Sequence, residues 1–511
     1  MKFLKKIVNR LTVVSLALAL QLLWLIAIPF ILTQYYYLLS SIFTLFSLIV
    51  VALIINRQSD PAIKLAWVVP ILVFPILGWA IYLLFGTDFS QKLIDKKLRS
   101  LPPVLSLRRF SSREIIDGVK STEPSLAGLM NYTAKNGFPV FRNTSTKYYP
   151  LGDLWFSDLL DELKKAEKFI FLEFFIIKQG YMWDSILEIL KERAACGVDV
   201  RVIYDDVGSI NHIPSRYYKD LQKLGIKCFA FNKFRPFLSI IMNNRDHRKI
   251  AVIDGKVAFT GGANIADEYI NKVSPHGHWK DASVRLKGEA AASLTSLFLE
   301  TWNANRPTDK PGDGERLFLP DDEYLSSCHS DGFVQPYGDS PLDSELLSEN
   351  IYLSIINGAT DYLYIFTPYL ITDNLLTDAL SLAAKRGVDV RIVIPGVPDK
   401  RIVYQVTLSH CIPLINSGVK IYTYTAGFIH SKCFVCDGKV ASVGTVNLDY
   451  RSLHIHFECG CLFYGSSAVE SVYKDAIDTF ERSELLVIKK ARMGLIKKFF
   501  YAALRLFAPL M

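Results

Sequence analysis

The N-terminal part of the chain, residues 1–86, is rich in apolar side chains. No charged residue occurs between Arg10 and Arg57, and two apolar runs fill this stretch, roughly Leu11 to Leu32 and Tyr35 to Ile55. A third run extends from Leu65 to Phe85. Each run is close to the roughly 20 residues that an α-helix needs to cross a bilayer. The pattern therefore predicts a transmembrane helical anchor of two or three spans.

Two features of this anchor stay open at the level of sequence. A cleaved signal peptide is the alternative for the first run, but its apolar core is too long and a second run follows at once. Pro70, Pro75 and Gly78 interrupt the third run, which either crosses the membrane or re-enters it. Lysines before the first run predict a cytoplasmic N-terminus, but hydropathy does not fix the side on which the rest of the chain lies.

Beyond the anchor, strand-like and helix-like runs alternate, and one arrangement occurs twice. The strand-like runs Phe169 to Ile177 and Tyr362 to Ile371 are each followed by helical periodicity. A second strand then begins with Gly-Val-Asp-Val-Arg, at Gly197 and again at Gly387. Each half thus contains a β-α-β unit. The sequence predicts an α/β fold in which two fused β-α-β repeats form a pseudo-dimer with helices packed on largely buried sheets.

Shifts in composition predict where these parts begin and end. Residues 87–130 are basic and contain Pro102-Pro103, which indicates a linker. The first repeat is assigned to residues 131–315 and the second to 323–487, on either side of a polar segment rich in Pro, Gly and Asp. Residues 488–511 are predicted to form a basic amphipathic helix. Such a helix lies at a membrane interface, and docking on the protein's own surface is the alternative.

The composition favours an anionic partner and no cofactor. The chain has 511 residues and a formal net charge of +8, which suits either nucleic acid or acidic lipid. Because the chain carries a hydrophobic anchor, we predict an anionic lipid surface and no nucleic acid. Cys433-x-x-Cys436 and Cys459-x-Cys461 are spaced like zinc ligands, but both lie in apolar strand-like runs without a second ligand pair. We therefore predict no metal site, and the sequence does not predict the oligomeric state.

One polar motif occurs in both halves of the chain. His247-x-Lys249-x-x-x-x-Asp254 is repeated as His430-x-Lys432-x-x-x-x-Asp437, and each copy is followed by glycine and asparagine. These asparagines are Asn264 and Asn447. A histidine and a lysine two residues apart on a strand project from the same face. The motif would therefore place a nucleophile or proton carrier beside a fixed cation, which suits attack on a phosphate ester.

A pseudo-dimer would bring the two histidines together, and phosphodiester exchange needs two such groups. One imidazole attacks phosphorus, and the other protonates the departing alkoxide and then deprotonates the acceptor. The lysines and the two asparagine amides can hold the non-bridging oxygens. Each histidine also needs a carboxylate on its other ring nitrogen, for which Asp281 and Glu458 are candidates. Asp254 and Asp437 complete the predicted catalytic set, with a structural role at the strand turn as the alternative.

The motif with its downstream Gly and Asn resembles the signature of the phospholipase D superfamily, over roughly residues 130 to 490. More narrowly, the chain resembles the bacterial cardiolipin synthase family in Asn244 to Ile250, Gly261 to Ile265, Gly444 to Ser452 and His456-Phe457-Glu458. The resemblance implies that two phosphatidylglycerol molecules give cardiolipin and glycerol in the cell membrane of a bacterium. It also implies a phosphohistidine intermediate, with His247 as nucleophile and His430 as acid and base.

Three other functions compete with this interpretation. A hydrolytic phospholipase D would use the same residues with water as acceptor, so only its products would differ. A phosphodiester nuclease would use the positive charge to hold nucleic acid, but the basic residues cluster beside the hydrophobic runs and no aromatic-basic stacking platform is evident. A non-enzymatic membrane scaffold would tolerate damage to one motif, and both motifs are complete.

Overall fold

The computed structural model describes residues 33–57, 60–86, 107, 110, 112–233, 244–306, 318–343, 345–487 and 495–508. The chain divides into two units. The helical unit combines residues 1–96 and 232–244 with the C-terminal residues 493–511. The α/β unit comprises residues 97–231 and 245–492 and contains both copies of the polar motif.

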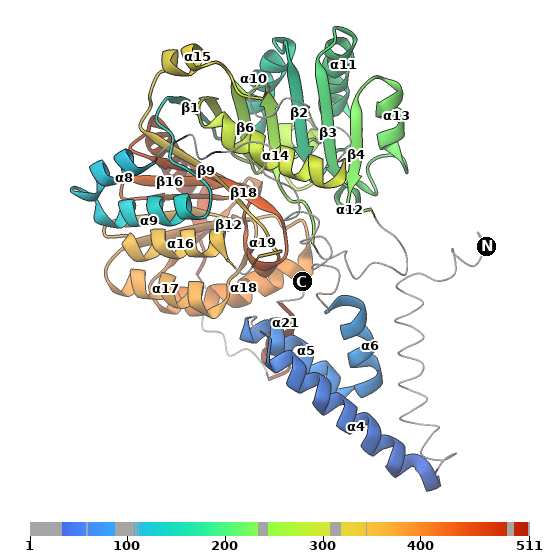
Figure 1. Cartoon of the computed structure of the whole chain (residues 1–511). Helices are drawn as coiled ribbons and strands as arrows, with labels where there is room; N and C mark the ends of the chain where they lie inside the picture. The colour runs from blue at the N-terminus through green and yellow to red at the C-terminus, as the bar shows by residue number, and fades with distance from the viewer. Residues whose placement is uncertain are drawn as a thin grey trace. The chain divides into compact units, whose positions relative to one another are not determined.

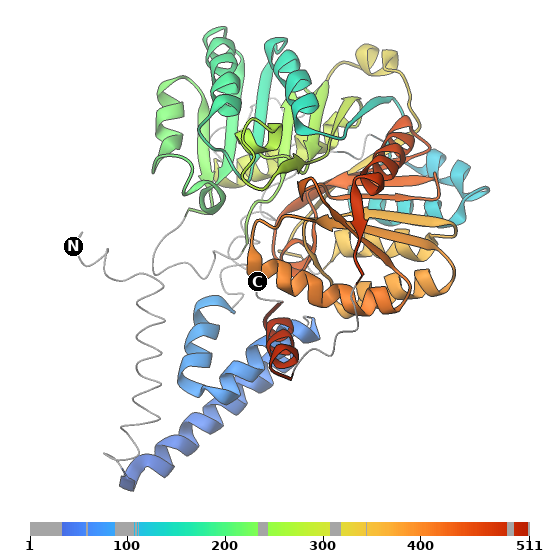
Figure 2. The same ribbon diagram turned by 180° about the vertical axis from the view of Figure 1, so that it is seen from behind.

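The helical unit contains α4 (Thr33–Ile55), α5 (Pro61–Val73), α6 (Pro75–Phe85) and α21 (Leu495–Phe507). The third apolar run is split at Phe74, because Pro75 cannot continue the hydrogen-bond ladder of α5. The C-terminal helix α21 packs against α5 (Figure 2). Within the described residues, no helix combines the length and apolarity needed to cross a bilayer. The first predicted span lies outside the described residues.

The first repeat of the α/β unit is built on a seven-stranded mixed sheet with the order β1-β8-β6-β5-β2-β3-β4. β2 pairs in parallel with β3, and β3 with β4, whereas β5, β6, β8 and β1 are antiparallel. The strands are β1 (Thr144–Tyr149), β2 (Phe169–Phe174), β3 (Asp199–Asp205), β4 (Lys227–Phe231), β5 (Lys249–Ile253), β6 (Val257–Gly261) and β8 (Ser283–Gly288). The helices are α10 (Gly152–Lys164), α11 (Tyr181–Ala195), α12 (Asp206–Ser209), α13 (Tyr217–Lys223) and α14 (Ala291–Asn305).

The second repeat reproduces this order as β9-β18-β16-β15-β10-β12-β13, with β19 added at the edge. Its strands are β9 (Phe333–Asp339), β10 (Tyr362–Phe366), β12 (Asp389–Pro395), β13 (Lys420–Tyr424), β15 (Cys433–Cys436), β16 (Val440–Gly444), β18 (Glu458–Tyr464) and β19 (Ser483–Leu485). Its helices are α16 (Leu347–Gly358), α17 (Asn374–Lys385), α18 (Arg401–Asn416), α19 (Tyr450–His454) and α20 (Ser467–Glu481). The two predicted α/β repeats are thereby confirmed.

α14 lies between the two sheets (Figure 1), and α20, the last helix of the second repeat, contacts strands of both repeats. α14 contacts β5 of its own repeat and β9 of the other, and nearly all of its residues are buried. α20 contacts β1 of the first repeat in the same way. Side chains from both repeats therefore share one hydrophobic core. This shared core fixes the two repeats against each other, as the predicted pseudo-dimer requires.

Residues before the first repeat form two helices, α8 (Arg113–Lys120) and α9 (Pro124–Lys135). The sequence assigned most of this segment to a linker. In the structure Ile115, Leu129 and Met130 are buried in the core of the second repeat, where α9 packs on α16. The polar segment between the repeats is followed by the short helix α15 (Asp322–Ser327), after which β9 begins the second sheet.

Candidate active site

Short strands that pair across the two repeats bring the motifs together. The backbone N–H of His247 donates to the carbonyl of Phe457 at 2.9 Å, next to a parallel bridge between Asp246 and Phe457. In the same way β14 (Gly427–Ile429), which ends just before His430, pairs in parallel with β7 (His278–Lys280). The backbone N–H of His430 donates to the carbonyl of Lys280 at 2.7 Å. Each histidine therefore lies beside the backbone of the opposite repeat.

This pairing crosses the two histidine–carboxylate pairs. Nδ1 of His247 lies 2.9 Å from both oxygens of Glu458, and Nδ1 of His430 lies 2.6 Å from Oδ2 of Asp281. Both carboxylates are fully buried. Because a carboxylate only accepts, each Nδ1 carries the proton, and each Nε2 is left with the lone pair that can attack phosphorus or carry a proton. The sequence indicated both carboxylates but not which histidine each contacts.

The two motif lysines are buried beside the histidines. Lys249 and Lys432 are each 1% exposed, and each Nζ donates to the backbone carbonyl of its own motif histidine. Nζ of Lys432 also lies 2.9 Å from Nδ1 of His430. Burial lowers the pKa of Lys249 to about 8 and that of Lys432 to about 7. Burial thus disfavours the charged form of both lysines, and a bound anion would stabilise that form.

The histidine pKa values indicate that all four groups form one electrostatic centre. Burial lowers the pKa of His247 well below its usual value, and the charges of Lys249 and Lys432 lower it further. Burial and Lys432 lower the pKa of His430 to about 4, against the opposing effect of Asp281. Both imidazoles are therefore neutral near pH 7, the form that can act as a nucleophile or a base. An anionic phosphodiester placed among them would raise all four pKa values.

The two predicted phosphate-binding asparagines differ in their contacts. Oδ1 of Asn264 accepts the backbone N–H of Ile176 at 3.1 Å, and its Nδ2 donates to the hydroxyl of Tyr269 at 2.8 Å. Asn447 is 5% exposed, and within the described residues its Oδ1 makes no hydrogen bond. Both side chains are buried, while their contact with phosphate stays a prediction.

Asp254 and Asp437 lie away from the histidines. At ~3.3 Å per residue, the seven residues from His247 to Asp254 span about 23 Å of strand. Asp254 accepts the backbone N–H groups that lead into β2, those of Glu167, Lys168 and Phe169, at 2.8 to 2.9 Å. Asp437 accepts the equivalent groups before β10, and both aspartates have positive φ, 54° and 52°. These contacts support the structural alternative over a catalytic role.

Other aromatic and imidazole rings lie beside the two histidines. The rings of Phe175 and His456 lie 5.1 and 5.5 Å from the ring of His247. The rings of Tyr269 and Trp279 lie 5.4 and 5.6 Å from that of His430. Sequence reasoning gave none of them a role. A signal existed for two of them, since Trp279 and His456 each stand two residues before a histidine-orienting carboxylate.

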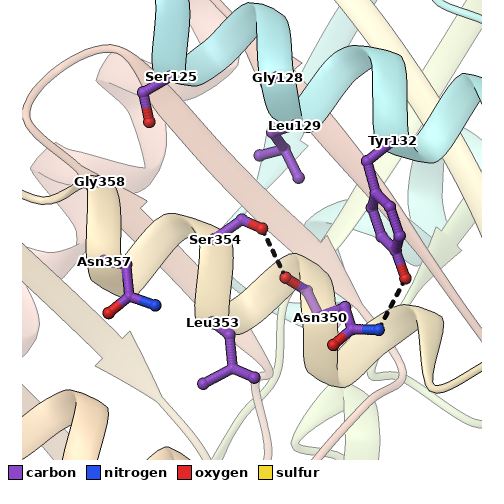
Figure 3. Close-up of a pocket in the computed structure, with 9 residues that line it drawn as sticks. All are labelled: Ser125, Gly128, Leu129, Tyr132, Asn350, Leu353, Ser354, Asn357 and Gly358. Atoms are coloured by element: carbon purple, nitrogen blue, oxygen red, sulfur yellow. Dashed lines mark hydrogen bonds between the residues drawn. The ribbon is translucent and has the colours of Figure 1, made fainter.

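A separate cavity of about 650 Å³ lies between α9 and α16, and no residue of the two motifs lines it (Figure 3). Its walls include Tyr132 and Asn350, whose side chains hydrogen-bond to each other at 2.9 Å. Tyr132 and Asn350 both also bond Glu345. Because these polar groups already hydrogen-bond to one another, the cavity is a weaker candidate for a catalytic site.

The fold and the paired motifs define a phospholipase D-like protein. Residues 159–300 and 352–482 match the family described as "Cardiolipin synthase, PLD-like domain". Residues 42–86 match a second family, described as "Phospholipase_D-nuclease N-terminal". The chain therefore belongs to the cardiolipin synthase family of phospholipase D-like proteins.

Individual relatives agree with this assignment. The chain is similar to a cardiolipin synthase of Geobacillus kaustophilus, with 35% identity over 86% of this chain and 87% of the relative. It is also 42% identical to an uncharacterized protein of Streptococcus mutans serotype c, over 84% of this chain and 92% of the relative. A solved phosphatidylserine synthase of Haemophilus influenzae covers 75% of this chain and 99% of its own, with a TM-score of 0.56 and 13% identity, which supports the fold.

Proposed function

We propose that the protein is a cardiolipin synthase that transfers a phosphatidyl group from one phosphatidylglycerol to another and releases glycerol. The observation that carries the proposal is the pair of crossed contacts, His247 with Glu458 and His430 with Asp281, in one buried centre with two lysines. A two-step displacement at phosphorus requires one imidazole as nucleophile and one as general acid and base, and the centre contains two imidazoles. The similarity to cardiolipin synthases over most of the chain supports the choice of lipid substrate.

In the first step the lone pair on Nε2 of His247 attacks phosphorus. Binding of the anionic phosphodiester raises the pKa of His430, which takes up a proton on Nε2 from solvent. The bond between phosphorus and the glycerol oxygen breaks, and His430 donates this proton to that oxygen, so that glycerol leaves as a neutral alcohol. Lys249 and Lys432 stabilise the charge that develops on the non-bridging oxygens. Glu458 stabilises the positive charge that His247 acquires when its Nε2 bonds to phosphorus.

In the second step the glycerol hydroxyl of another phosphatidylglycerol attacks the same phosphorus. His430 now takes the proton of this hydroxyl, because it lost its own proton in the first step. The bond between phosphorus and Nε2 of His247 breaks, which regenerates the neutral imidazole and releases cardiolipin. Protons and electrons balance over the two steps, since His430 returns to its initial form.

We also propose that the helical unit holds the enzyme at the bacterial cell membrane, where both lipids reside. Along α4, Leu38, Leu45 and Leu53 are more than 60% exposed. Apolar side chains at this exposure are costly in water and favourable in lipid. On α21, Phe499 is 79% exposed and Phe500 is 53% exposed, which suits a helix at the membrane interface.

The test of the function is incubation of the purified, detergent-solubilised protein with phosphatidylglycerol labelled in its headgroup and its acyl chains. Formation of cardiolipin with one labelled glycerol released per product supports the synthase. Phosphatidic acid without cardiolipin would instead identify a hydrolytic phospholipase D and overturn the proposal. The His247→Ala protein serves as the control, because contaminating activity would persist in that sample.

A further inference from the structure

The two repeats place different residues at one equivalent position beside the reacting histidines. His456 stands two residues before Glu458, and Trp279 stands two residues before Asp281. The ring of His456 lies 5.5 Å from that of His247 at an interplanar angle of 43°. The ring of Trp279 lies 5.6 Å from that of His430 at 44°. The ring geometry is the same, but Nδ1 of His456 lies 3.7 Å from Oε1 of Glu458, whereas Nε1 of Trp279 makes no hydrogen bond within the described residues.

The contacts of His456 fix its tautomer. Nε of Arg451 lies 3.3 Å from Nε2 of His456. Because arginine can only donate, Nε2 must accept, and the imidazole proton is therefore on Nδ1. Burial lowers the pKa of His456 to about 3, so the ring stays neutral. Its Nδ1 is buried, has no hydrogen-bond partner within the described residues, and lies 3.7 Å from Oε1 of Glu458.

A second donor contacts the other oxygen of the same carboxylate. The hydroxyl of Thr445 donates to Oε2 of Glu458 and accepts the backbone N–H of Cys459 at 2.9 Å. The first repeat has Gly262 at this position, and a Cβ there would lie only 2.0 Å from Oδ1 of Asp281. The shorter aspartate thus occupies the space of the threonine side chain. Glu458 therefore accepts the Thr445 hydroxyl and faces Nδ1 of His456 at 3.7 Å. On the other side, Oδ1 of Asp281 accepts the backbone N–H of Ala282 at 2.8 Å.

We propose that Thr445 and His456, the latter held by Arg451, are positioning residues that fix Glu458 for His247 and have no counterpart for His430. The inference rests on the proposed function for the identity of the nucleophile. His247 gains positive charge when its Nε2 bonds to phosphorus, so Glu458 must stay ionised and aligned on Nδ1 throughout that step. The Thr445 hydroxyl on Oε2 and the Nδ1–H of His456 facing Oε1 favour the ionised form of Glu458, and the hydroxyl restricts the rotation of the carboxylate.

The test uses a substrate in which p-nitrophenol replaces the glycerol headgroup of phosphatidylglycerol. Nitrophenolate leaves without a proton, so the burst of nitrophenolate from detergent-solubilised enzyme reports the attack by His247 and does not need His430 as acid. Thr445→Val and His456→Phe remove the donors while retaining the approximate volume of the side chains. Hydrogen bonds to a charged group support an expected loss on the order of 10- to 100-fold in the burst rate, with little change in KM.

Conservative variants separate positioning from a structural role. Thr445→Ser and His456→Asn retain a donor near the carboxylate and should recover most of the burst rate. Thr479→Val, the same substitution in α20, removes a hydroxyl that bonds the carbonyl of Asp475 and should leave the burst unchanged. Wild-type burst rates in Thr445→Val and His456→Phe would overturn the proposal. Equal losses in the conservative and disruptive variants would also overturn it, as would a full burst in His247→Ala.

The same preparations also separate this proposal from the proposed function. The wild-type protein is assayed in parallel for cardiolipin formation from phosphatidylglycerol. Absence of cardiolipin with an intact nitrophenolate burst would contradict the synthase function. The roles of Thr445 and His456 would then still be decided by the burst rates of their variants relative to the wild type. Normal cardiolipin formation with unaffected variants would contradict the positioning roles alone.

Discussion

The two repeats share one strand order and one motif, but the reacting histidines lie in different surroundings. His247 has the ring of Phe175 at 5.1 Å on one side, while its carboxylate partner Glu458 receives the hydroxyl of Thr445 and faces His456. His430 lies among the aromatic rings of Tyr269, Trp279 and Phe428, at 5.4 to 5.8 Å. Duplication of a fold thus supplies two imidazoles in one buried centre, and the different residues around them suit the different roles that we propose.

The largest effects are expected at the two crossed carboxylates. Glu458→Gln should lower kcat by about 10³- to 10⁴-fold, because the amide no longer stabilises the tautomer and the positive charge of His247. The loss should appear with both phosphatidylglycerol and the nitrophenol substrate. Asp281→Asn should lower turnover of phosphatidylglycerol by a similar factor but leave the nitrophenolate burst largely intact. Equal losses of the burst in both variants would mean that the two histidines are not distinct in role.

The lysines should show a smaller effect that is nearly equal in the two repeats. Lys249→Met and Lys432→Met each remove a cation aimed at the phosphate oxygens, with an expected loss of about 10²- to 10³-fold in kcat. Burying each lysine charge destabilises the free enzyme, so removal of the charge does not weaken the fold. The melting temperature of the Lys→Met variants should therefore not fall below that of the wild type. A fall in melting temperature that parallels the loss of activity would indicate a structural role.

The pH dependence of anion binding should reveal the weaker base of the two lysines. The pKa of Lys432 is about 7 and that of Lys249 about 8, so both are protonated below pH 7 and lose their charge in that order as the pH rises. The dissociation constant of dimethyl phosphate, which stays a monoanion, should rise by about tenfold per pH unit between pH 7 and 8, and more steeply above pH 8. Titration calorimetry measures this slope. If the Lys432→Met protein showed the same pH dependence above pH 7, the slope would not arise from the deprotonation of Lys432.

The smallest effect on turnover is expected at the strand turns. Asp254→Asn and Asp437→Asn weaken hydrogen bonds to backbone N–H groups before β2 and β10 and should each lower the free energy of unfolding by about 1–3 kcal/mol. Because neither carboxylate lies near the histidines, kcat should fall only a few-fold. Chemical denaturation and steady-state kinetics on the same samples measure both quantities. A loss of activity comparable to that of the lysine variants, without a change in stability, would restore a catalytic role.

Most of the fold and the reacting groups could be predicted because they are encoded locally. The β-α-β pattern and the spacing from His247 to Lys249 are readable within short stretches of sequence, and each occurs twice in the chain. The crossed pairing could not be predicted, because His247 and Glu458 are 211 residues apart and meet only through a strand pair between the repeats. Residues 113–135 were assigned mostly to a linker because α8 and α9 are short and are stabilised by tertiary packing on α16.

The residues that surround each histidine could also not be predicted from the sequence. Thr445 could be noted as a departure from Gly262, but its contact with Glu458 depends on a carboxylate that is longer by one methylene than Asp281. The catalytic assignment of Asp254 and Asp437 followed from their place in the motif. Their backbone partners lie more than 70 residues away in the chain, so the structural role is evident only in the folded protein.

The most direct test of the central claim is to trap the covalent intermediate. The His430→Ala protein should react with the nitrophenol substrate, because this leaving group needs no acid, and should then stall, because no base remains to activate the acceptor. Digestion and mass spectrometry should locate one phosphatidyl group on His247, while His247→Ala should trap none. A phosphatidyl group on His430 in the His247→Ala protein, or on any other residue of either variant, would contradict the account.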